Sequence, residues 1–236
     1  NRGKPAYTVS AIKGGQCMDT FDLYKDIQCR TNGEIYLGVV GPVRSGKSTF
    51  IKRFMDVLVL PKMTDEHAKE RTVDELPQSA SGKSIMTTEP KFVPKEAAEI
   101  QLAKDVSVLV RLIDCVGYMV EGAAGHMENG AERLVKTPWN EKEIPFTKAA
   151  EIGTKKVIHD HSTIGIVVTT DGSIGELPRN SYRAAEKKTI QELKSIGKPF
   201  VVLVNTRKPY SAEAKNVAEE IQKEYQVTAL PVNCEQ

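Results

Sequence analysis

The stretch Gly41-Pro42-Val43-Arg44-Ser45-Gly46-Lys47-Ser48 decides the fold of this chain. It matches the pattern G-x-x-x-x-G-K-[ST], follows the apolar run 35–40 and opens an amphipathic stretch, 48–59. In that order a strand, a loop and a helix form a phosphate-binding loop, because backbone N–H groups and the positive end of the helix converge on phosphate. The context therefore favours a nucleotide-binding site over a chance match.

Each part of this loop has an expected task around a nucleoside triphosphate and Mg²⁺. The two glycines permit the backbone conformation, the ammonium of Lys47 reaches the β- and γ-phosphates, and the hydroxyl of Ser48 binds Mg²⁺, which prefers oxygen ligands. Thr49 follows in the helix, where its side chain is expected to join the core. The predicted nucleotide-binding segment comprises Gly41, Pro42, Val43, Arg44, Ser45, Gly46, Lys47, Ser48 and Thr49.

Outward from this loop, β-rich runs alternate with helical stretches. The predicted strands are 35–40, 106–113, 163–170, 200–205 and 227–232, and the predicted helices are 48–59, 147–161, 182–195 and 212–225. Such alternation predicts an α/β fold of three layers, with a mostly parallel sheet and helices on both faces. Together with the loop it indicates a P-loop NTPase of the GTPase-like switch type. Segments 62–94 and 117–145 carry scattered Gly and Pro and are predicted to be irregular.

The second chemical signal is Asp114-Cys115-Val116-Gly117, directly after the apolar strand 106–113. The carboxyl end of that strand should bring the carboxylate of Asp114 beside the phosphate-binding loop. There Asp114 can hold Mg²⁺ through a water, and Gly117 lets a backbone N–H approach the γ-phosphate, as in the D-x-x-G element of switch NTPases. Lys47 and Asp114 are therefore predicted to be catalytic residues.

Thr87 and Thr88 stand in the long polar segment before Asp114, where switch enzymes place a threonine that senses the γ-phosphate and Mg²⁺. We expect this catalytic role here, with Thr88 as a further Mg²⁺ ligand, and an ordinary Ser/Thr turn is the alternative. Tyr118 occupies the position at which many GTPases carry a water-positioning Gln. Another group must then position the water, and the sequence leaves Glu121 and Arg44 open as candidates.

The base-reading motif departs from the GTPase pattern. After the strand 200–205 comes Asn205-Thr206-Arg207-Lys208, where guanine-specific enzymes carry N-K-x-D. Guanine presents N–H donors that a carboxylate accepts, whereas the Lys208 ammonium is itself a donor. Guanine selectivity should therefore be lost, and adenine, with an acceptor at N1, fits this site; Asn205 and Lys208 are predicted to contact the nucleotide. The alternative is that the base-reading residues lie elsewhere.

Composition limits the other functions. The 236 residues, 40% hydrophobic and 27% charged, suit one large soluble α/β domain. No run of about 18 apolar residues could span a bilayer. A formal net charge of +2 predicts no broad surface for nucleic acid. The four cysteines are scattered, which indicates a reducing compartment, and His159 and His161 are expected to be solvated rather than metal ligands.

Five long strings resemble the N-terminal nucleotide-binding region of the stage IV sporulation protein A family, the spore-coat morphogenetic ATPases of endospore-forming bacteria. They are YLGVVGPVRSGKSTFIKRFM (36–55), DELPQSASGKSIMTTEPKFVP (74–94), RLIDCVGY (111–118), TPWNEKEIPFTKAAEIGT (137–154) and TTDGSIGE (169–176). The resemblance covers residues 18–236, the expected GTPase-like P-loop NTPase domain. Residues 1–17 are interpreted as an expression-derived remnant or a disordered leader, and the family's middle and C-terminal regions are expected to be missing.

The resemblance implies a domain that hydrolyses ATP with Mg²⁺ and drives self-polymerisation into the basement layer of the coat. It makes Lys47 the P-loop lysine, Thr87 and Thr88 the paired threonines that couple hydrolysis to a shape change, and Asp114 the carboxylate on the Mg²⁺ side. The implied partners are ATP, further copies, a small amphipathic membrane-anchoring peptide and spore coat proteins. The implied location is the mother-cell cytoplasm at the outer forespore membrane, with membrane contact only through other regions.

Two other functions remain open. A GTP-dependent switch could recruit partners without any self-assembly, and competition of GTP against bound ATP would distinguish it. A small-molecule P-loop kinase is disfavoured, because no Arg-rich lid is apparent and the long loop carries a threonine pair instead.

Overall fold

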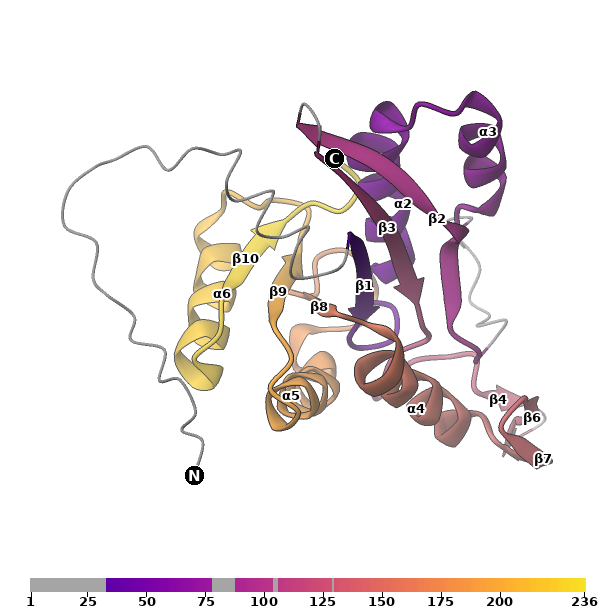
Figure 1. The fold of residues 1–236 in the computed structure, drawn as a ribbon. Coiled ribbons are helices and arrows are strands. Elements are labelled where there is room, and N and C mark those ends of the chain that lie inside the picture. Colours follow the sequence, from indigo (N-terminus) through magenta and orange to yellow (C-terminus); the bar gives the residue numbers. More distant parts are fainter. Residues whose placement is uncertain (1–32, 78–87, 104–105, 129) are drawn as a thin grey trace, which may run out of the picture.

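A six-stranded sheet is the middle layer of the computed structural model, which describes residues 33–77, 88–103, 106–128 and 130–236. The strand order is β10-β9-β8-β1-β3-β2 (Figure 1). Five strands pair in parallel, and β2 runs antiparallel to β3 at one edge. The mostly parallel sheet predicted from the sequence is therefore confirmed. The strands are β1 (Glu34–Val40), β2 (Lys91–Ala103), β3 (Val106–Asp114), β8 (Ile164–Thr170), β9 (Phe200–Asn205) and β10 (Ala229–Val232).

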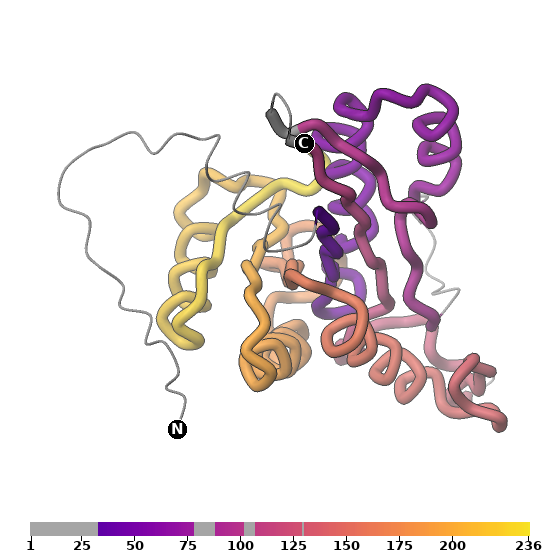
Figure 2. The backbone as a smooth tube through the Cα atoms, viewed as in Figure 1, coloured from indigo at the N-terminus to yellow at the C-terminus, as the bar shows by residue number. Residues whose placement is uncertain are grey.

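The described chain enters the sheet at β1, in the middle. Figure 2 follows it from β1 to the edge strand β2 and back to β3 on one side, and then to β8, β9 and β10 on the other. The direction of winding thus reverses beside β1, and open α/β sheets bind their ligands at the carboxyl ends of the strands at such a point.

Helices cover both faces of the sheet, as predicted. On one face Ile158, Leu193 and Ile221 pack against β8 and β9; on the other, Ile51 and Met55 pack against β1, β3 and β8. The central strands are consequently apolar on both sides, as is typical of parallel sheets. The helices are α2 (Lys47–Phe54) with η1 (Met55–Val59) and η2 (Leu60–Lys62), α3 (Glu66–Glu75), α4 (Phe146–Lys156) with η3 (Val157–His161), α5 (Arg179–Ser195) and α6 (Ala212–Tyr225).

The prediction of irregular structure for segment 62–94 was wrong at both ends. Residues 66–75 form α3, which Asp65 begins by accepting hydrogen bonds from the N–H groups of His67 and Ala68. Only Thr72 of this helix is buried, so the sequence offered no apolar period to recognise. Lys91 already begins β2, an edge strand whose pairing with β3 shifts register between Val93 and Ala98.

The second segment predicted to be irregular, 117–145, contains two small hairpins. They are formed by β4 (Met127–Glu128) with β5 (Ala131–Glu132), and by β6 (Leu134–Thr137) with β7 (Asn140–Pro145). Figure 1 shows them together at one end of the molecule, beyond α4. Arg133 lies between the hairpins and places its guanidinium 4.6 Å from the ring centroid of Phe146, the first residue of α4.

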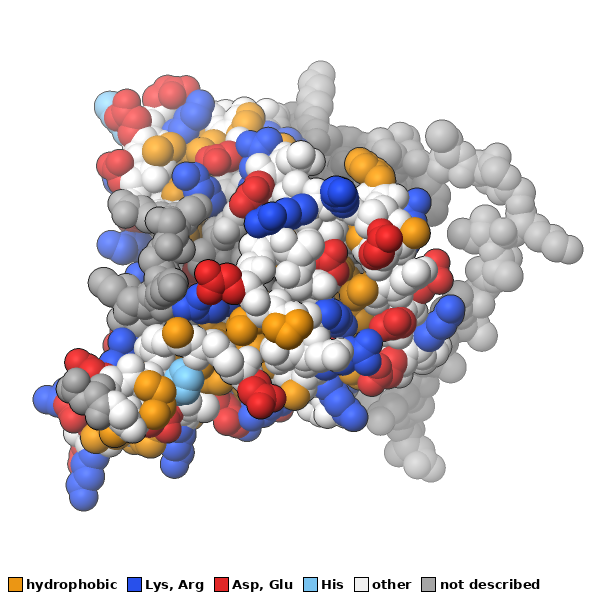
Figure 3. Space-filling view, turned by 180° about the vertical axis from the view of Figure 1, so that it is seen from behind, with side chains coloured by type: hydrophobic (Ala, Val, Ile, Leu, Met, Phe, Trp, Pro, Cys, Tyr) orange, Lys and Arg blue, Asp and Glu red, His pale blue; other side chains and the backbone are white. Residues whose placement is uncertain are grey.

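Charged side chains of both signs are interspersed over the face drawn in Figure 3. This distribution agrees with a formal net charge of only +2. Within the described ranges, the helices are too short or too polar for any of them to cross a membrane.

We predict that Ile51→Ala destabilises the fold by about 2–5 kcal/mol, because Ile51 is completely buried between α2 and the sheet. Leu58→Ala is the matched control, since Leu58 lies on the following turn and is 44% exposed. It should cost roughly 1 kcal/mol or less. Urea unfolding followed by circular dichroism measures both; equal costs would contradict this account of the α2 interface.

Candidate functional site

The register of β1 against β3 brings the two chemical motifs together. Val39 pairs with Asp114, so the phosphate-binding loop and the D-x-x-G segment leave the sheet side by side. The pairing continues past the strands, because Pro42 forms a parallel bridge with Tyr118. The N–H of Val43 donates to the Tyr118 carbonyl at 2.8 Å, and the N–H of Tyr118 donates to the Gly41 carbonyl at 3.2 Å.

Glycine is required at three points of this junction. Gly41, Gly46 and Gly117 all have positive φ, a conformation that side chains disfavour. A Cβ at Gly41 would collide with the Val168 carbonyl, and one at Gly117 with the Gly41 carbonyl. A Cβ at Gly46 would collide with the amide of Asn205. The loop is thus enclosed by β8, by the D-x-x-G segment and by the end of β9.

The other loop residues divide into buried and exposed positions. Val43 belongs to the core and Ser45 is fully buried, with a hydroxyl that bonds to no residue the structure describes. Arg44 is exposed at φ +61° and donates from Nη2 to the carbonyl of Ala124 at 3.3 Å. Thr49 lies in α2 and is half-buried, in agreement with its expected place in the helix.

Lys47 and Asp114 face each other across the loop. The Lys47 ammonium donates to the Pro42 carbonyl at 2.6 Å and is buried, and this burial lowers the pKa of Lys47. Burial likewise raises the pKa of Asp114, against the opposing effects of the Ser48 hydrogen bond and the Lys47 charge. Both groups are therefore short of solvation in their charged forms, a deficit that phosphate oxygens and a cation would relieve.

The oxygen atoms of Ser48 and Asp114 fit a magnesium site. The Ser48 hydroxyl donates to Asp114 Oδ2 at 2.8 Å. The second oxygen, Oδ1, is enclosed and has no hydrogen-bond partner among the described residues. An orphaned carboxylate oxygen beside a hydroxyl is a donor set of the kind that Mg²⁺ takes, usually together with several waters.

Gly117 and Tyr118 lie where the sequence places them, but Tyr118 is turned inward. A Cβ on Gly117 would come within 2.7 Å of Lys47 Nζ, so the Gly117 backbone borders the phosphate end of the site. The Tyr118 ring is 3% exposed and lies 4.7 Å below Lys188 Nζ. Its hydroxyl is enclosed without a partner in the described part of the chain. Tyr118 therefore has no side-chain group that can orient water at the phosphates.

Thr88 lies against α4, and Thr87 falls outside the described residues. Thr88 is 5% exposed, and its carbonyl approaches Gly153 so closely that a Cβ there would lie at 2.6 Å. Nothing in this arrangement tests the sensing or metal-binding roles predicted for the two threonines. Glu121, the other open candidate for orienting water, is exposed.

The base-side motif has a buried half and an exposed half. Asn205 is 4% exposed; its Nδ2 donates to the Ser45 carbonyl at 3.1 Å, and its Oδ1 accepts from the N–H of Cys234 at 3.1 Å. Asn205 therefore ties the end of β9 to the phosphate-binding loop and to the segment after β10. Thr206 is 1% exposed, whereas Lys208 is exposed at the start of the β9–α6 loop.

The sequence did not identify Ser173, whose hydroxyl oxygen lies 3.3 Å from that of Thr206 and joins the loops after β8 and β9. Ser173 matches no motif, because its relation to Thr206 depends on two loops that are distant in sequence.

His159, His161 and the two described cysteines contact other protein groups. His159 Nε2 lies 2.7 Å from Glu192 Oε1, and the His161 ring meets Phe92 edge-on. His159 is exposed, as predicted, whereas His161 is half-buried. No cluster of metal-ligating residues occurs in the described ranges. Cys115 and Cys234 are buried and free, and burial raises the pKa of Cys115 to about 11; a thiol of this kind is poorly reactive.

Comparison with known proteins identifies the family that this chain matches. Residues 18–236 match a family described as "Stage IV sporulation protein A, ATPase domain". A protein named stage IV sporulation protein A from Clostridioides difficile (strain 630) is 57% identical over 212 residues, which are 90% of this chain and 43% of that protein. The protein of the same name from Bacillus subtilis (strain 168) is 51% identical over 218 residues, 92% of this chain and 44% of that one.

The chain thus spans less than half the length of the curated relatives it matches. Among solved structures, a mutation variant of SsGBP is 14% identical, with a TM-score of 0.44 over 91% of this chain and 54% of that one. That similarity is too low to add to the assignment.

We predict that Gly117→Ala slows phosphate release from a bound nucleoside triphosphate by about a hundredfold, because the new methyl group must push the segment away from Gly41. Gly130→Ala is the matched control: its φ is also positive, but nothing lies within 4 Å of the added Cβ. Both variants share the backbone strain, so only Gly117→Ala should lose turnover. Similar turnover in the two variants would contradict the tight junction.

Proposed function

The chain belongs to the stage IV sporulation protein A family, and from that premise we propose that this domain binds and hydrolyses ATP. The family supplies an ATPase domain by description, over residues 18–236. The observation that carries the proposal is the convergence of Lys47, Ser48 and Asp114 at the carboxyl ends of β1 and β3. These are the cation, hydroxyl and carboxylate that phosphoryl transfer to water requires in a P-loop enzyme.

In this proposal the phosphates lie in the loop of residues 41–48, at the N-terminus of α2, with Lys47 neutralising charge on the β- and γ-phosphates. Ser48 and Asp114 would hold Mg²⁺, and Thr88 is proposed as a further ligand. The metal, when bound, supplies charge neutralisation between the phosphates. The Gly117 N–H donates to the γ-phosphate, and Thr87 and Thr88 couple its loss to a shape change.

Slow turnover is part of this proposal. The side chain after the D-x-x-G glycine is that of Tyr118, which is buried, so the usual orientation of water by a Gln is missing. Arg44 and Glu121 remain the candidates for orienting water: both are exposed, and Arg44 belongs to the phosphate-binding loop itself. A slow reaction suits a protein that hydrolyses ATP during assembly rather than in many rapid cycles.

ATP is the proposed nucleotide because the base side lacks an acceptor for guanine. Asn205 keeps the buried position that ties this loop to the phosphates. Lys208 is exposed at the mouth of the loop, where its ammonium can donate to the N1 acceptor of adenine. The N–H donors of guanine would instead face the Lys208 ammonium, which is also a donor.

We further propose that hydrolysis drives self-polymerisation into the basement layer of the spore coat. The proposal extends to a small amphipathic membrane-anchoring peptide and coat proteins as partners, in the mother cell at the outer forespore membrane. Its support is the family membership, since this chain covers only 43% of the length of one relative and 44% of another.

We predict that Lys47→Ala lowers ATP hydrolysis by roughly two orders of magnitude or more, because the phosphate-bound ammonium and its stabilisation of transition-state charge are lost together. Phosphate release at saturating ATP measures the effect. Lys52→Ala, an exposed lysine one turn further along the same helix, is the control and should hydrolyse normally. Near wild-type turnover by the Lys47 variant would rule out its assigned role.

We predict that wild type binds ATP at least as tightly as GTP, and that Lys208→Asp moves the ratio toward GTP by about 1–3 kcal/mol, because a carboxylate accepts from the guanine donors. Lys215→Asp, an equal charge change on exposed α6, should leave the ratio alone. Competition binding with both nucleotides is the measurement. A wild type that strongly prefers GTP would support the alternative of a GTP switch, and a shift toward ATP would place Lys208 away from the base.

A further inference from the structure

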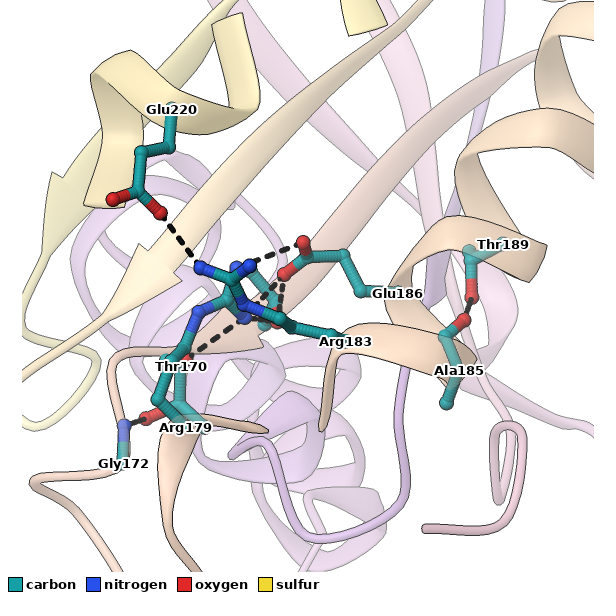
Figure 4. Close-up of polar contacts among 9 residues, drawn as sticks. Thr170, Gly172, Arg179, Arg183, Ala185, Glu186, Thr189 and Glu220 are labelled. Carbon is teal, nitrogen blue, oxygen red and sulfur yellow. Dashed lines mark hydrogen bonds and ion pairs between the residues drawn. The ribbon is translucent and has the colours of Figure 1, made fainter. Parts of the chain in front are cut away.

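A buried ion pair lies at the start of α5, close to the loop that follows β8. Arg179 and Glu186, both on α5, pair in a bidentate manner at 2.6 and 2.8 Å (Figure 4). Glu186 is 1% exposed and also accepts from the Thr169 hydroxyl at 2.6 Å. A carboxylate so buried needs these donors, so the pair is fixed in one geometry.

This pair holds the loop that follows β8. Arg179 Nη1 donates to the carbonyl of Thr170 at 3.3 Å, and the Thr170 hydroxyl accepts from the N–H of Gly172 at 3.0 Å (Figure 4). Gly172 has φ +91°, and a Cβ there would lie 2.8 Å from the backbone nitrogen of Arg179. In addition, Asp171 Oδ1 accepts a hydrogen bond from the N–H of Ser173. The loop 170–173 is therefore set firmly against the start of α5.

Ser173 connects the loop 170–173 to the loop that follows β9, which carries Thr206 and Lys208. Its hydroxyl oxygen accepts from the N–H of Arg207 at 3.0 Å and lies 3.3 Å from the hydroxyl of Thr206. The Thr206 oxygen in turn accepts from the N–H of Lys208 at 3.2 Å. Two successive N–H groups after Thr206 are thus satisfied by hydroxyls: that of Arg207 by Ser173 itself, and that of Lys208 by Thr206, whose hydroxyl lies against Ser173.

We propose that Ser173 is a positioning residue for base selection: it fixes the turn 206–208, and with it the side chain of Lys208, in the orientation that meets the base. The proposal rests on the proposed ATP site. The network is separate from the phosphate machinery, because its bonds involve neither Lys47 nor Ser48 nor Asp114. Ser173 therefore acts on which nucleotide binds, while the rate of phosphate transfer from a saturated site does not depend on it.

The test compares Ser173→Ala with Ser173→Thr, which keeps the hydroxyl, in the whole 236-residue chain. Kd for ATP and GTP is measured by competition, and KM and kcat for ATP by phosphate release. Ser173→Ala should raise Kd and KM for ATP about three- to tenfold and lower the ATP-over-GTP preference, with kcat unchanged. Ser173→Thr should restore the preference. Ser195→Ala, whose hydroxyl donates to the Glu192 carbonyl at the other end of α5, should behave as wild type.

Glu186→Gln probes the same network from its buried end and should shift the preference in the same direction, with melting curves to confirm that it is folded. An unchanged ATP-over-GTP ratio in Ser173→Ala overturns the inference, and so does a lower kcat at unchanged KM. If wild type prefers ATP and the variant keeps that preference, the inference fails alone. If wild type has no preference, the inference fails because Ser173 has no selectivity to set, and if wild type prefers GTP, the proposed ATP site fails.

Discussion

The pairing of β1 with β3 is the constraint on which the rest of this domain depends. Because Val39 lies opposite Asp114, the loop of residues 41–48 and the carboxylate of Asp114 leave the sheet at the same place. The hydrogen bond from Ser48 to Asp114 closes that arrangement at 2.8 Å. A slip of one residue would turn Asp114 to the other face of the sheet, so the apolar pattern of these two strands also preserves the chemistry.

The parallel strands could be predicted from the sequence because each is a short apolar run, and β8 is buried on both faces. The helix predicted at 212–225 is found at those residues, and the one predicted at 182–195 begins three residues earlier, after Pro178. The edge strand β2 and the helix α3 could not be predicted from the sequence, whereas the other edge strand, β10, was. The strand β2 contains Pro94 and charged residues, and α3 buries little, so neither carries the apolar period that marks core elements.

The residues of the candidate site likewise comprise some that the sequence predicted and some that it did not. Ser48, Asp114 and Gly117 were predicted from motifs and meet in space, because the motifs encode a local strand-to-loop geometry. Asn205 was predicted to contact the nucleotide, and the structure adds that it joins the Ser45 carbonyl to Cys234. Ser173 was missed because its partners belong to a loop that only the fold brings near. Hydrogen bonds between loops leave no periodic trace in a sequence.

The inward turn of Tyr118 limits how this scaffold can be changed by evolution or by a protein engineer. A swap to glutamine would not simply install the missing catalytic amide, since it would remove a buried ring, leave a void under Lys188 and bury a polar group instead. The main chain of residue 118 is hydrogen-bonded to Gly41 and Val43, so the backbone could not shift freely to turn a glutamine side chain toward the phosphates. A side chain that accelerates hydrolysis would have to come from another position, so a single change at Tyr118 would not easily remove the slow turnover proposed for this domain.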